Sequence, residues 1–271
     1  MPAIWDAPSA CLHPVRVFAI TGAGISAESG IPTFRGKDGH WRNLDPAKLA
    51  TPEAFARDPK LVWEWYNERR QQIGNAKPNA AHEAIAQLAT TTSEFLLVTQ
   101  NVDDLHARAG LPKEKMVQIH GDIFVTRCSR CEFSRNERSD DVSSVRELDR
   151  LKRSSLEAAQ NLELPRCRVC NGLMRPGVVW FGEQLDPYKI DMVEDFLNRG
   201  SCDPVLVIGT TALFGYITDW AMRARSEIGQ LIEINPEETP LSRFATNCIR
   251  KPAAVALPKL VSKIAAGGRQ L

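Results

Sequence analysis

The sequence lacks any apolar run near the roughly 20 residues that a membrane-spanning helix needs. Its longest apolar stretches, residues 17–20 and 253–257, are far shorter. The first 14 residues have no basic residue ahead of an apolar segment and no arginine-rich pattern, so neither a secretory signal nor an organellar presequence is visible. We therefore expect a soluble, cytoplasmic protein without a membrane partner.

An excess of charge of either sign is also lacking. The chain has 34 basic and 33 acidic residues, a net charge of +1, and so has no overall field to attract nucleic acid or anionic lipid. With 43% apolar and 25% charged residues, its composition excludes a disordered chain. Its 271 residues suffice for one large core, or for a core with an inserted module. We expect the protein to be a monomer and to have no nucleic-acid partner.

Cysteine is scarce and odd in number, which argues against a disulfide framework. Four of the seven cysteines form two C-x-x-C pairs, Cys128 with Cys131 and Cys167 with Cys170. Two such pairs can supply the closed tetrahedral shell of a structural Zn²⁺ in a reducing compartment. Redox-active pairs or coincidental core cysteines are the alternatives. The other three cysteines have no partner at ligand spacing and are expected to be ordinary thiols: Cys11, Cys202 and Cys248.

Five short apolar runs predict buried parallel strands at residues 15–20, 95–98, 116–119, 205–208 and 231–234. Each run ends in polar or glycine-containing residues, and in open parallel sheets ligands bind beyond such strand ends. Helices are predicted at residues 59–73, after an Asp-Pro start and before Gly74, and at residues 79–89. Residues 128–170 are dense in charges of both signs and lack long apolar runs, so they are expected to form an inserted module. The predicted fold class is α/β with a Rossmann-like parallel sheet.

The first strand leads into a G-x-G-x-x-A turn formed by Gly22, Gly24 and Ala27. This placement predicts a following helix whose N-terminus faces a pyrophosphate. A turn that uses glycine only for backbone freedom explains the pattern equally well. The acidic residue that ordinary dehydrogenases place about 20 residues further on, after a second strand, is missing. Residues 29–36 are too rich in glycine and proline to form that strand.

Residues 22–36, Gly-Ala-Gly-Ile-Ser-Ala-Glu-Ser-Gly-Ile-Pro-Thr-Phe-Arg-Gly, closely resemble the NAD-binding signature of the sirtuins, which are NAD-dependent protein lysine deacylases. The resemblance continues through Thr-Gln-Asn-Val-Asp at 99–103, His-Gly-Asp at 120–122, both cysteine pairs, Gly-Val-Val-Trp-Phe-Gly-Glu at 177–183, Gly-Thr-Thr at 209–211 and Glu-Ile-Asn at 233–235. It covers about residues 15–260.

This resemblance implies three parts of the chain. Residues 1–36, 77–126 and 175–271 would form a Rossmann-like NAD-binding domain. Residues 37–76 would form a helical segment with the cofactor loop and the acyl pocket, and residues 127–174 the zinc-binding module.

The resemblance also implies NAD as cofactor, acylated-lysine proteins as substrates and His120 as the catalytic general base toward a ribose hydroxyl. Asn101 and Asp103 would orient the ribose and hold the nicotinamide carboxamide; from the residues alone, this polar run could simply cap a helix over residues 102–109. The expected cofactor contacts are Gly22, Ala23, Gly24, Ser26, Ala27, Glu28, Ile31, Thr33, Phe34, Arg35, Trp41, Gln100, Asn101, Val102, Asp103, His120, Gly209, Thr210, Thr211, Asn235, Glu237 and Ala253.

An extended segment is expected to pair with the backbone of the substrate by strand addition, although a plain core strand would have the same pattern. It consists of Val178, Val179, Trp180, Phe181, Gly182 and Glu183. Such a grip on the main chain implies a weak preference for peptide sequence.

Tyr66 and Arg69 stand at i and i+3 on one face of the helix predicted at 59–73. Alone, such a pair is usually a stacked surface pair. With Ala50, it resembles the acyl pocket of the desuccinylase and demalonylase branch, because an arginine fork and a phenol can bind a terminal carboxylate. We expect removal of succinyl and malonyl groups, and of acetyl groups as well, with release of nicotinamide, O-acyl-ADP-ribose and free lysine.

The sequence departs from the sirtuin pattern after the strand at residues 205–208. Gly209-Thr210-Thr211 replaces Gly-Thr-Ser, and residues 212–216 lack the proline common there, so the cofactor edge is expected to be reshaped. Two other functions compete with deacylation: NAD-dependent ADP-ribosylation of proteins, and a zinc-ribbon binding module on an inert Rossmann scaffold. The balanced charge argues against the second.

Overall fold

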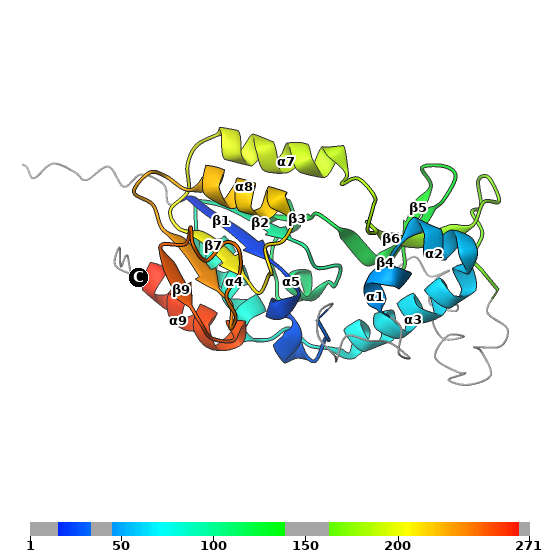
Figure 1. The fold of residues 1–271 in the computed structure, drawn as a ribbon, viewed down its shortest axis with the longest axis horizontal. Helices are drawn as coiled ribbons and strands as arrows, with labels where there is room; N and C mark the ends of the chain where they lie inside the picture. Colours follow the sequence, from blue (N-terminus) through cyan, green and yellow to red (C-terminus); the bar gives the residue numbers. More distant parts are fainter. Residues whose placement is uncertain (1–15, 34–44, 139–162, 266–271) are drawn as a thin grey trace, which may run out of the picture.

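A computed structural model describes residues 16–33, 45–138 and 163–265 of the chain. Figure 1 shows a larger part built around one sheet and a smaller part at the other end of the molecule. Within the described residues, no helix is both long and apolar enough to span a membrane.

The larger part is a six-stranded sheet in the order β3-β2-β1-β7-β8-β9, with parallel pairing throughout. Five of its strands lie at the predicted runs: β1 (Arg16–Thr21), β2 (Glu94–Thr99), β3 (Met116–Gln118), β7 (Val205–Ile208) and β8 (Leu231–Ile234). The sixth, β9 (Asn247–Ile249), was not predicted. Its three residues are partly or fully exposed at the sheet edge, so they carry no apolar run.

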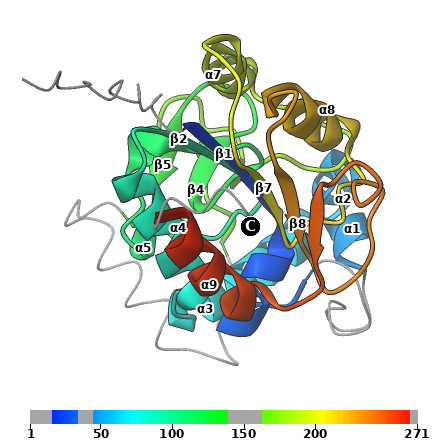
Figure 2. The ribbon, with the colours of Figure 1, turned by 90° about the vertical axis from the view of Figure 1, so that its left-hand side faces the viewer.

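Helices cover both faces of this sheet, which explains why its strands read as nearly continuous apolar runs. Along β1, Val17 and Ala19 pack against α4 (Ala80–Thr91) and α9 (Ala253–Ala265). Phe18 and Ile20 point to the opposite face, toward α7 (Pro187–Asn198) and α8 (Gly215–Ala224). Figure 2 shows α7 and α8 above the strands and α4 and α9 below them.

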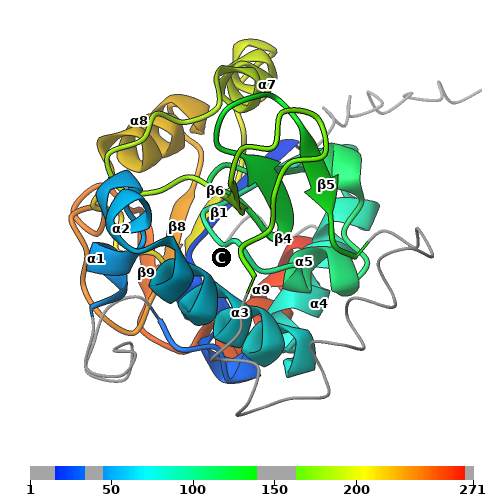
Figure 3. The same cartoon turned by 90° about the vertical axis from the view of Figure 1, so that its right-hand side faces the viewer.

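The smaller part combines a three-stranded antiparallel sheet with three helices (Figure 3). The strands are β4 (Gly121–Cys128), β5 (Ser134–Asn136) and β6 (Met174–Val178), and the helices are α1 (Pro46–Leu49), α2 (Pro52–Arg57) and α3 (Pro59–Asn75). They share a core of buried side chains that includes Trp63, Trp65, Ile123 and Met174. A short helix, α5 (Leu105–Arg108), follows β2.

The predicted helix at 59–73 is α3, which extends to Asn75, so that Gly74 lies inside the helix and does not end it. Asp58 caps α3, because its Oδ1 accepts from the backbone N–H of Leu61 at 3.0 Å. The helix predicted at 79–89 is α4, in which Asn79 is the N-cap.

Two local predictions are wrong. In the described residues directly after the glycine turn, up to residue 33, the chain forms no α-helix but two 3-10 turns, Ala23–Ile25 and Ala27–Ser29. Gly30, with a φ of 82°, ends the second turn, and Pro32 follows. The segment from Val178 to Glu183 is a strand only at its first residue, because a turn centred on Gly182, with a φ of 86°, reverses the chain.

Candidate functional site

The carboxyl ends of the parallel strands meet at one edge of the large sheet. Thr21 of β1 is in register with Thr99 of β2 and with Ile208 of β7. The loops that follow these strands line one cavity of about 660 Å³, a size typical of sites for small molecules. The predicted residues that line it are Gly22, Ala23, Gly24, Ser26, Ala27, Glu28, Ile31, Thr33, Ala50, Tyr66, Arg69, Gln100, Asn101, Val102, Asp103, His120, Val178, Val179, Trp180, Phe181, Gly182, Glu183, Gly209, Thr210, Thr211, Asn235, Glu237 and Ala253.

His120 lies between β3 and β4, where the two parts of the chain join. Its Nδ1 is 2.9 Å from the carbonyl oxygen of Gln100, which can only accept, so Nδ1 carries the hydrogen. Burial lowers the pKa of His120, and Lys189 lowers it further, whereas the bond to Gln100 raises it. The imidazole is therefore neutral at pH 7, and its basic lone pair lies on Nε2.

The turn after His120 depends on Gly121. Its φ is 88°, and a Cβ there would collide with the carbonyl oxygen of Gly177 in β6. Only glycine meets both conditions, so the close approach of β6 fixes where His120 enters the cavity.

A buried polar network lies at one wall of the cavity, to which it contributes Ser26, Asn101 and Asp103. Ser26 Oγ donates to Asp103 Oδ2 at 2.9 Å and accepts from Asn101 Nδ2 at 3.2 Å. His82 Nε2 is 3.3 Å from the same hydroxyl, and His82 Nδ1 accepts from the backbone N–H of Asn79. Since the serine hydrogen already points to Asp103, His82 donates through Nε2. Burial raises the pKa of Asp103 and lowers that of His82 to about 4.

The glycines of the turn serve close packing between strand ends. A Cβ on Gly24 would lie 2.8 Å from Cα of Gly209, and the amide of Gly24 already donates to the carbonyl of Gly209. The N-terminus of α9 is occupied by Glu28, whose Oε2 accepts from the amide of Ala254 at 2.7 Å. Because residues 23–29 form 3-10 turns, the described residues that follow the glycines do not supply the phosphate-facing helix N-terminus that the glycine pattern predicts.

Thr210 links the loop after β2 to the loop after β8. Gln100 Nε2 donates to its hydroxyl and Asn235 Nδ2 to its carbonyl, each at 2.8 Å. Asn235 Oδ1 also accepts from the amide of Glu237. These bonds fix a hydroxyl and a side-chain amide beyond β7 and β8, next to the exposed Glu237, and such polar groups suit the hydroxyls of a sugar.

Tyr66 and Arg69 line the same cavity from α3 and do not form a surface pair. Tyr66 is buried, and its oxygen accepts from Trp180 Nε1 at 2.9 Å, which leaves its own hydrogen free for another acceptor. Burial lowers the pKa of Arg69, although the nearby charge of Asp103 opposes this effect. Arg69 also lies over the Trp65 ring, 5.5 Å from its centroid.

The segment after β6 is held by its neighbours on both sides. The amide of Val179 donates to the carbonyl of His120, and that of Phe181 to the carbonyl of Ala50. Arg175 donates to both carboxylate oxygens of Glu183, at 2.5 and 2.9 Å. This chelated ion pair fixes the turn at one wall of the cavity.

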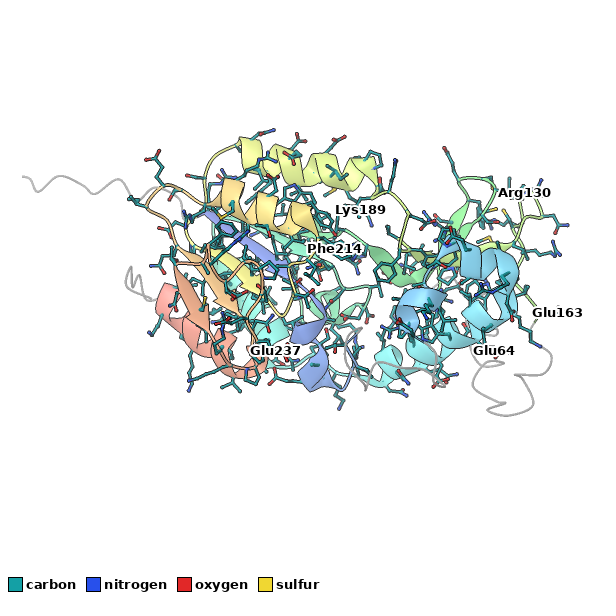
Figure 4. The ribbon with its side chains drawn as sticks, viewed as in Figure 1. Glu64, Arg130, Glu163, Lys189, Phe214 and Glu237 are labelled. Atoms are coloured by element: carbon teal, nitrogen blue, oxygen red, sulfur yellow. The ribbon has the colours of Figure 1, made fainter. Side chains whose placement is uncertain are left out.

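The four paired cysteines converge at the far end of the smaller part, near Arg130 in Figure 4. All four sulfurs lie within 4.8 Å of one another, and those of Cys128 and Cys170 are 3.4 Å apart. The amide of Arg130 points to the sulfur of Cys128, as in a zinc knuckle. Four thiolates at these separations fit one tetrahedral, structural Zn²⁺. Of the other cysteines, Cys202 is buried, Cys248 is exposed, and Cys11 lies outside the described residues.

Three predicted cofactor contacts, Phe34, Arg35 and Trp41, also lie outside the described residues. Two residues that sequence reasoning missed, Phe214 and Tyr216, line the cavity beside His120. Both belong to residues 212–216, and the missing proline in this segment was the one sequence feature that could have drawn attention to them. In Figure 4, Phe214 lies near the middle of the molecule and Glu237 nearer to α9, so the two residues lie in different regions of the site.

Comparisons of this sequence with a family model and with named proteins indicate the same family. The model of the Sir2 family matches residues 22–214. A protein of Aquifex aeolicus named "NAD-dependent protein deacylase" is 40% identical over 249 residues, 92% of this chain and 95% of that protein. One of Archaeoglobus fulgidus named "NAD-dependent protein deacylase 1" is 42% identical over 91% of each chain.

Two solved structures are similar over nearly the whole chain. A Sir2 homologue in complex with NAD superposes with a TM-score of 0.78 at 40% identity, covering 93% of this chain and 90% of the other. A Sir2 protein with a p53 peptide and NAD⁺ gives a TM-score of 0.73 at 27% identity, covering 93% and 94%.

Proposed function

This chain belongs to the Sir2 family, and from that membership we propose that it is an NAD-dependent protein lysine deacylase that prefers acyl groups ending in a carboxylate. The observation that supports the proposal best is the position of His120, Asp103 and Arg69 around one cavity. A base, a buried carboxylate and a cation converge there from three different elements.

The cavity suits NAD, which the enzyme consumes as a cosubstrate. NAD supplies an electrophilic ribose carbon, C1′, and nicotinamide as the leaving group. Asn101 and Asp103 are each 7% exposed and line the cavity, as expected of groups that fix an amide and a sugar. Thr210, Asn235 and Glu237 would hold the adenosine side.

Catalysis requires a base but no covalent nucleophile from the protein, because the acyl oxygen of the substrate attacks C1′. His120 takes the proton of a ribose hydroxyl and so activates that oxygen. The Gln100 carbonyl fixes the tautomer, and the lowered pKa keeps the imidazole neutral. Val179 and Phe181, anchored to His120 and Ala50, hold the substrate backbone beside it.

The preference for acidic acyl groups rests on Tyr66 and Arg69. A succinyl or malonyl carboxylate would accept two bonds from the guanidinium and one from the phenol, whose oxygen is already fixed by Trp180. Ala50 leaves space for the longer chain. An acetyl group cannot pair with this cation, but its carbonyl reacts in the same way, so acetyl-lysine is a poorer substrate.

The test is a comparison of one peptide in succinylated, malonylated and acetylated forms, with NAD present. We expect kcat/KM to be at least tenfold higher for the succinylated than for the acetylated peptide. Equal values would reject the acyl preference and leave deacylation intact. Failure to release free lysine from all three peptides would reject the proposed function.

A further inference from the structure

The acceptor nitrogen of His120 already has a partner. Tyr216 Oη lies 2.7 Å from His120 Nε2. Because Nδ1 carries the hydrogen of the neutral ring, Nε2 has only a lone pair, and the phenol must be the donor. Burial raises the pKa of Tyr216, so the phenol keeps its proton.

A set of stacked aromatic rings holds the phenol at this nitrogen. Tyr216 stacks on Phe214, with centroids 5.7 Å apart and planes 17° from parallel, and its other neighbour is Trp220 at 5.0 Å. Phe214 in turn meets the imidazole edge-on at 5.6 Å. The loop reaches this position through Ala212, whose φ of 49° is unusual for a residue with a side chain.

The proposed reaction requires this same nitrogen. A ribose hydroxyl must lose its proton to Nε2, yet Nε2 has one lone pair and the phenol occupies it. A phenol can accept through its own oxygen while it donates, so it can pass a proton on without leaving the base. Tyr216 and His120 line the same cavity, so a hydroxyl bound there is the group that the phenol oxygen would meet.

We propose that Tyr216 is a catalytic relay between the ribose hydroxyl and His120. In one step the hydroxyl proton moves to the phenol oxygen as the phenol proton moves to Nε2. The ribose oxygen gains the nucleophilic electron pair, His120 becomes imidazolium, and Tyr216 ends the step as a neutral phenol. The inference rests on the proposed function and adds to it a residue of the segment that lacks the proline of the sirtuin pattern.

The variant Tyr216→Phe tests the relay, because it removes one oxygen and keeps the ring stack. We expect kcat for the deacylation of a succinylated peptide to fall about 10- to 100-fold, with KM for NAD changed less than about twofold. Tyr188→Phe, on the exposed surface of α7, is the matched control and should retain the wild-type values. An unchanged kcat would overturn the relay. A higher kcat or a lower KM for NAD would overturn it too, because the phenol would then only block the base.

Two further measurements test the relay, the first in the wild-type enzyme alone and the second in a comparison with the folded variant that needs no turnover. In the wild-type enzyme, single-turnover rates in mixtures of H₂O and D₂O should curve with the deuterium fraction, since two protons move together; a linear plot would contradict the relay. NMR titration without NAD should show the pKa of His120 rising by about 0.4 to 1 unit in Tyr216→Phe, because donation to Nε2 favours the neutral ring.

These outcomes separate the two proposals. If the wild-type enzyme deacylates peptides and Tyr216→Phe does so equally well, only the relay fails. If the wild-type enzyme releases no lysine although the titration shows the expected shift, the hydrogen bond exists but both the deacylase function and the relay are rejected. A pKa of His120 that stays the same in Tyr216→Phe would reject the hydrogen bond itself.

Discussion

Replacing Arg69 by methionine should separate acidic from neutral acyl substrates. Methionine keeps much of the aliphatic length that packs beside Trp65 but removes the guanidinium. Tyr66 alone would then face the substrate carboxylate, as a single neutral donor. Loss of one partner of a desolvated charge pair typically costs about 2–5 kcal/mol, which corresponds to a decrease of about 30- to 4,000-fold in kcat/KM.

The assay compares succinylated and acetylated forms of one peptide, with Arg57→Met as the control. Arg57 is exposed at the end of α2, so its loss should change neither rate. We expect Arg69→Met to reduce kcat/KM for the succinylated peptide by the factor above and to change that for the acetylated peptide less than about threefold. An equal decrease for both peptides would refute the carboxylate pocket. Tyr66→Phe is a less direct test, because it also removes an acceptor for Trp180.

Four other predictions follow from the described contacts. Cys167→Ser should release the zinc and lower the thermal unfolding temperature, since structural zinc contributes ~10 kcal/mol or more to folding; retention of one metal equivalent by mass spectrometry would argue against the site. Gly24→Ala places a Cβ 2.8 Å from the Gly209 backbone, so urea unfolding should show about 1–3 kcal/mol less stability. The kcat/KM profile should keep its plateau below pH 6.5 and fall only at more acidic pH, because burial lowers the pKa of His120; an acid limb centred above 6.5 would contradict this. Burial lowers the pKa of both His82 and His106 in the folded protein below the value of about 6.5 in the unfolded chain. The free energy of unfolding should therefore be highest above pH 6.5 and fall toward pH 4 by about 1.4 kcal/mol per pH unit for each histidine, which urea unfolding can measure.

Features with strong local signals could be predicted from sequence. The five apolar strands have the composition of strands buried on both faces, and their polar ends line one cavity as expected. The cysteine pairs, with sulfurs close enough for one metal, could be predicted because two C-x-x-C turns have few other uses. Helix starts could be predicted from capping residues such as Asp58, because the side chain and the amide that it binds, that of Leu61, are only three residues apart in the sequence.

Features set by contacts between distant segments could not be predicted. The G-x-G-x-x-A pattern predicts a helix, but the chain continues as 3-10 turns, and the amide of Gly24 donates to the distant carbonyl of Gly209. The apparent strand ends in a turn at Gly182, where the amide of Phe181 donates to the carbonyl of Ala50. The bond from Tyr216 to His120 joins residues 96 positions apart, and no periodicity reports such a contact.

The central claim is that NAD is consumed only when an acylated lysine is deacylated. Nicotinamide and free lysine should therefore be measured together, with zinc-loaded enzyme, NAD and a succinylated peptide. The account predicts one nicotinamide for each lysine freed, and almost none when the unmodified peptide is supplied. Nicotinamide release that does not need the acyl group, with ADP-ribose attached to protein, would contradict it and indicate an ADP-ribosyltransferase.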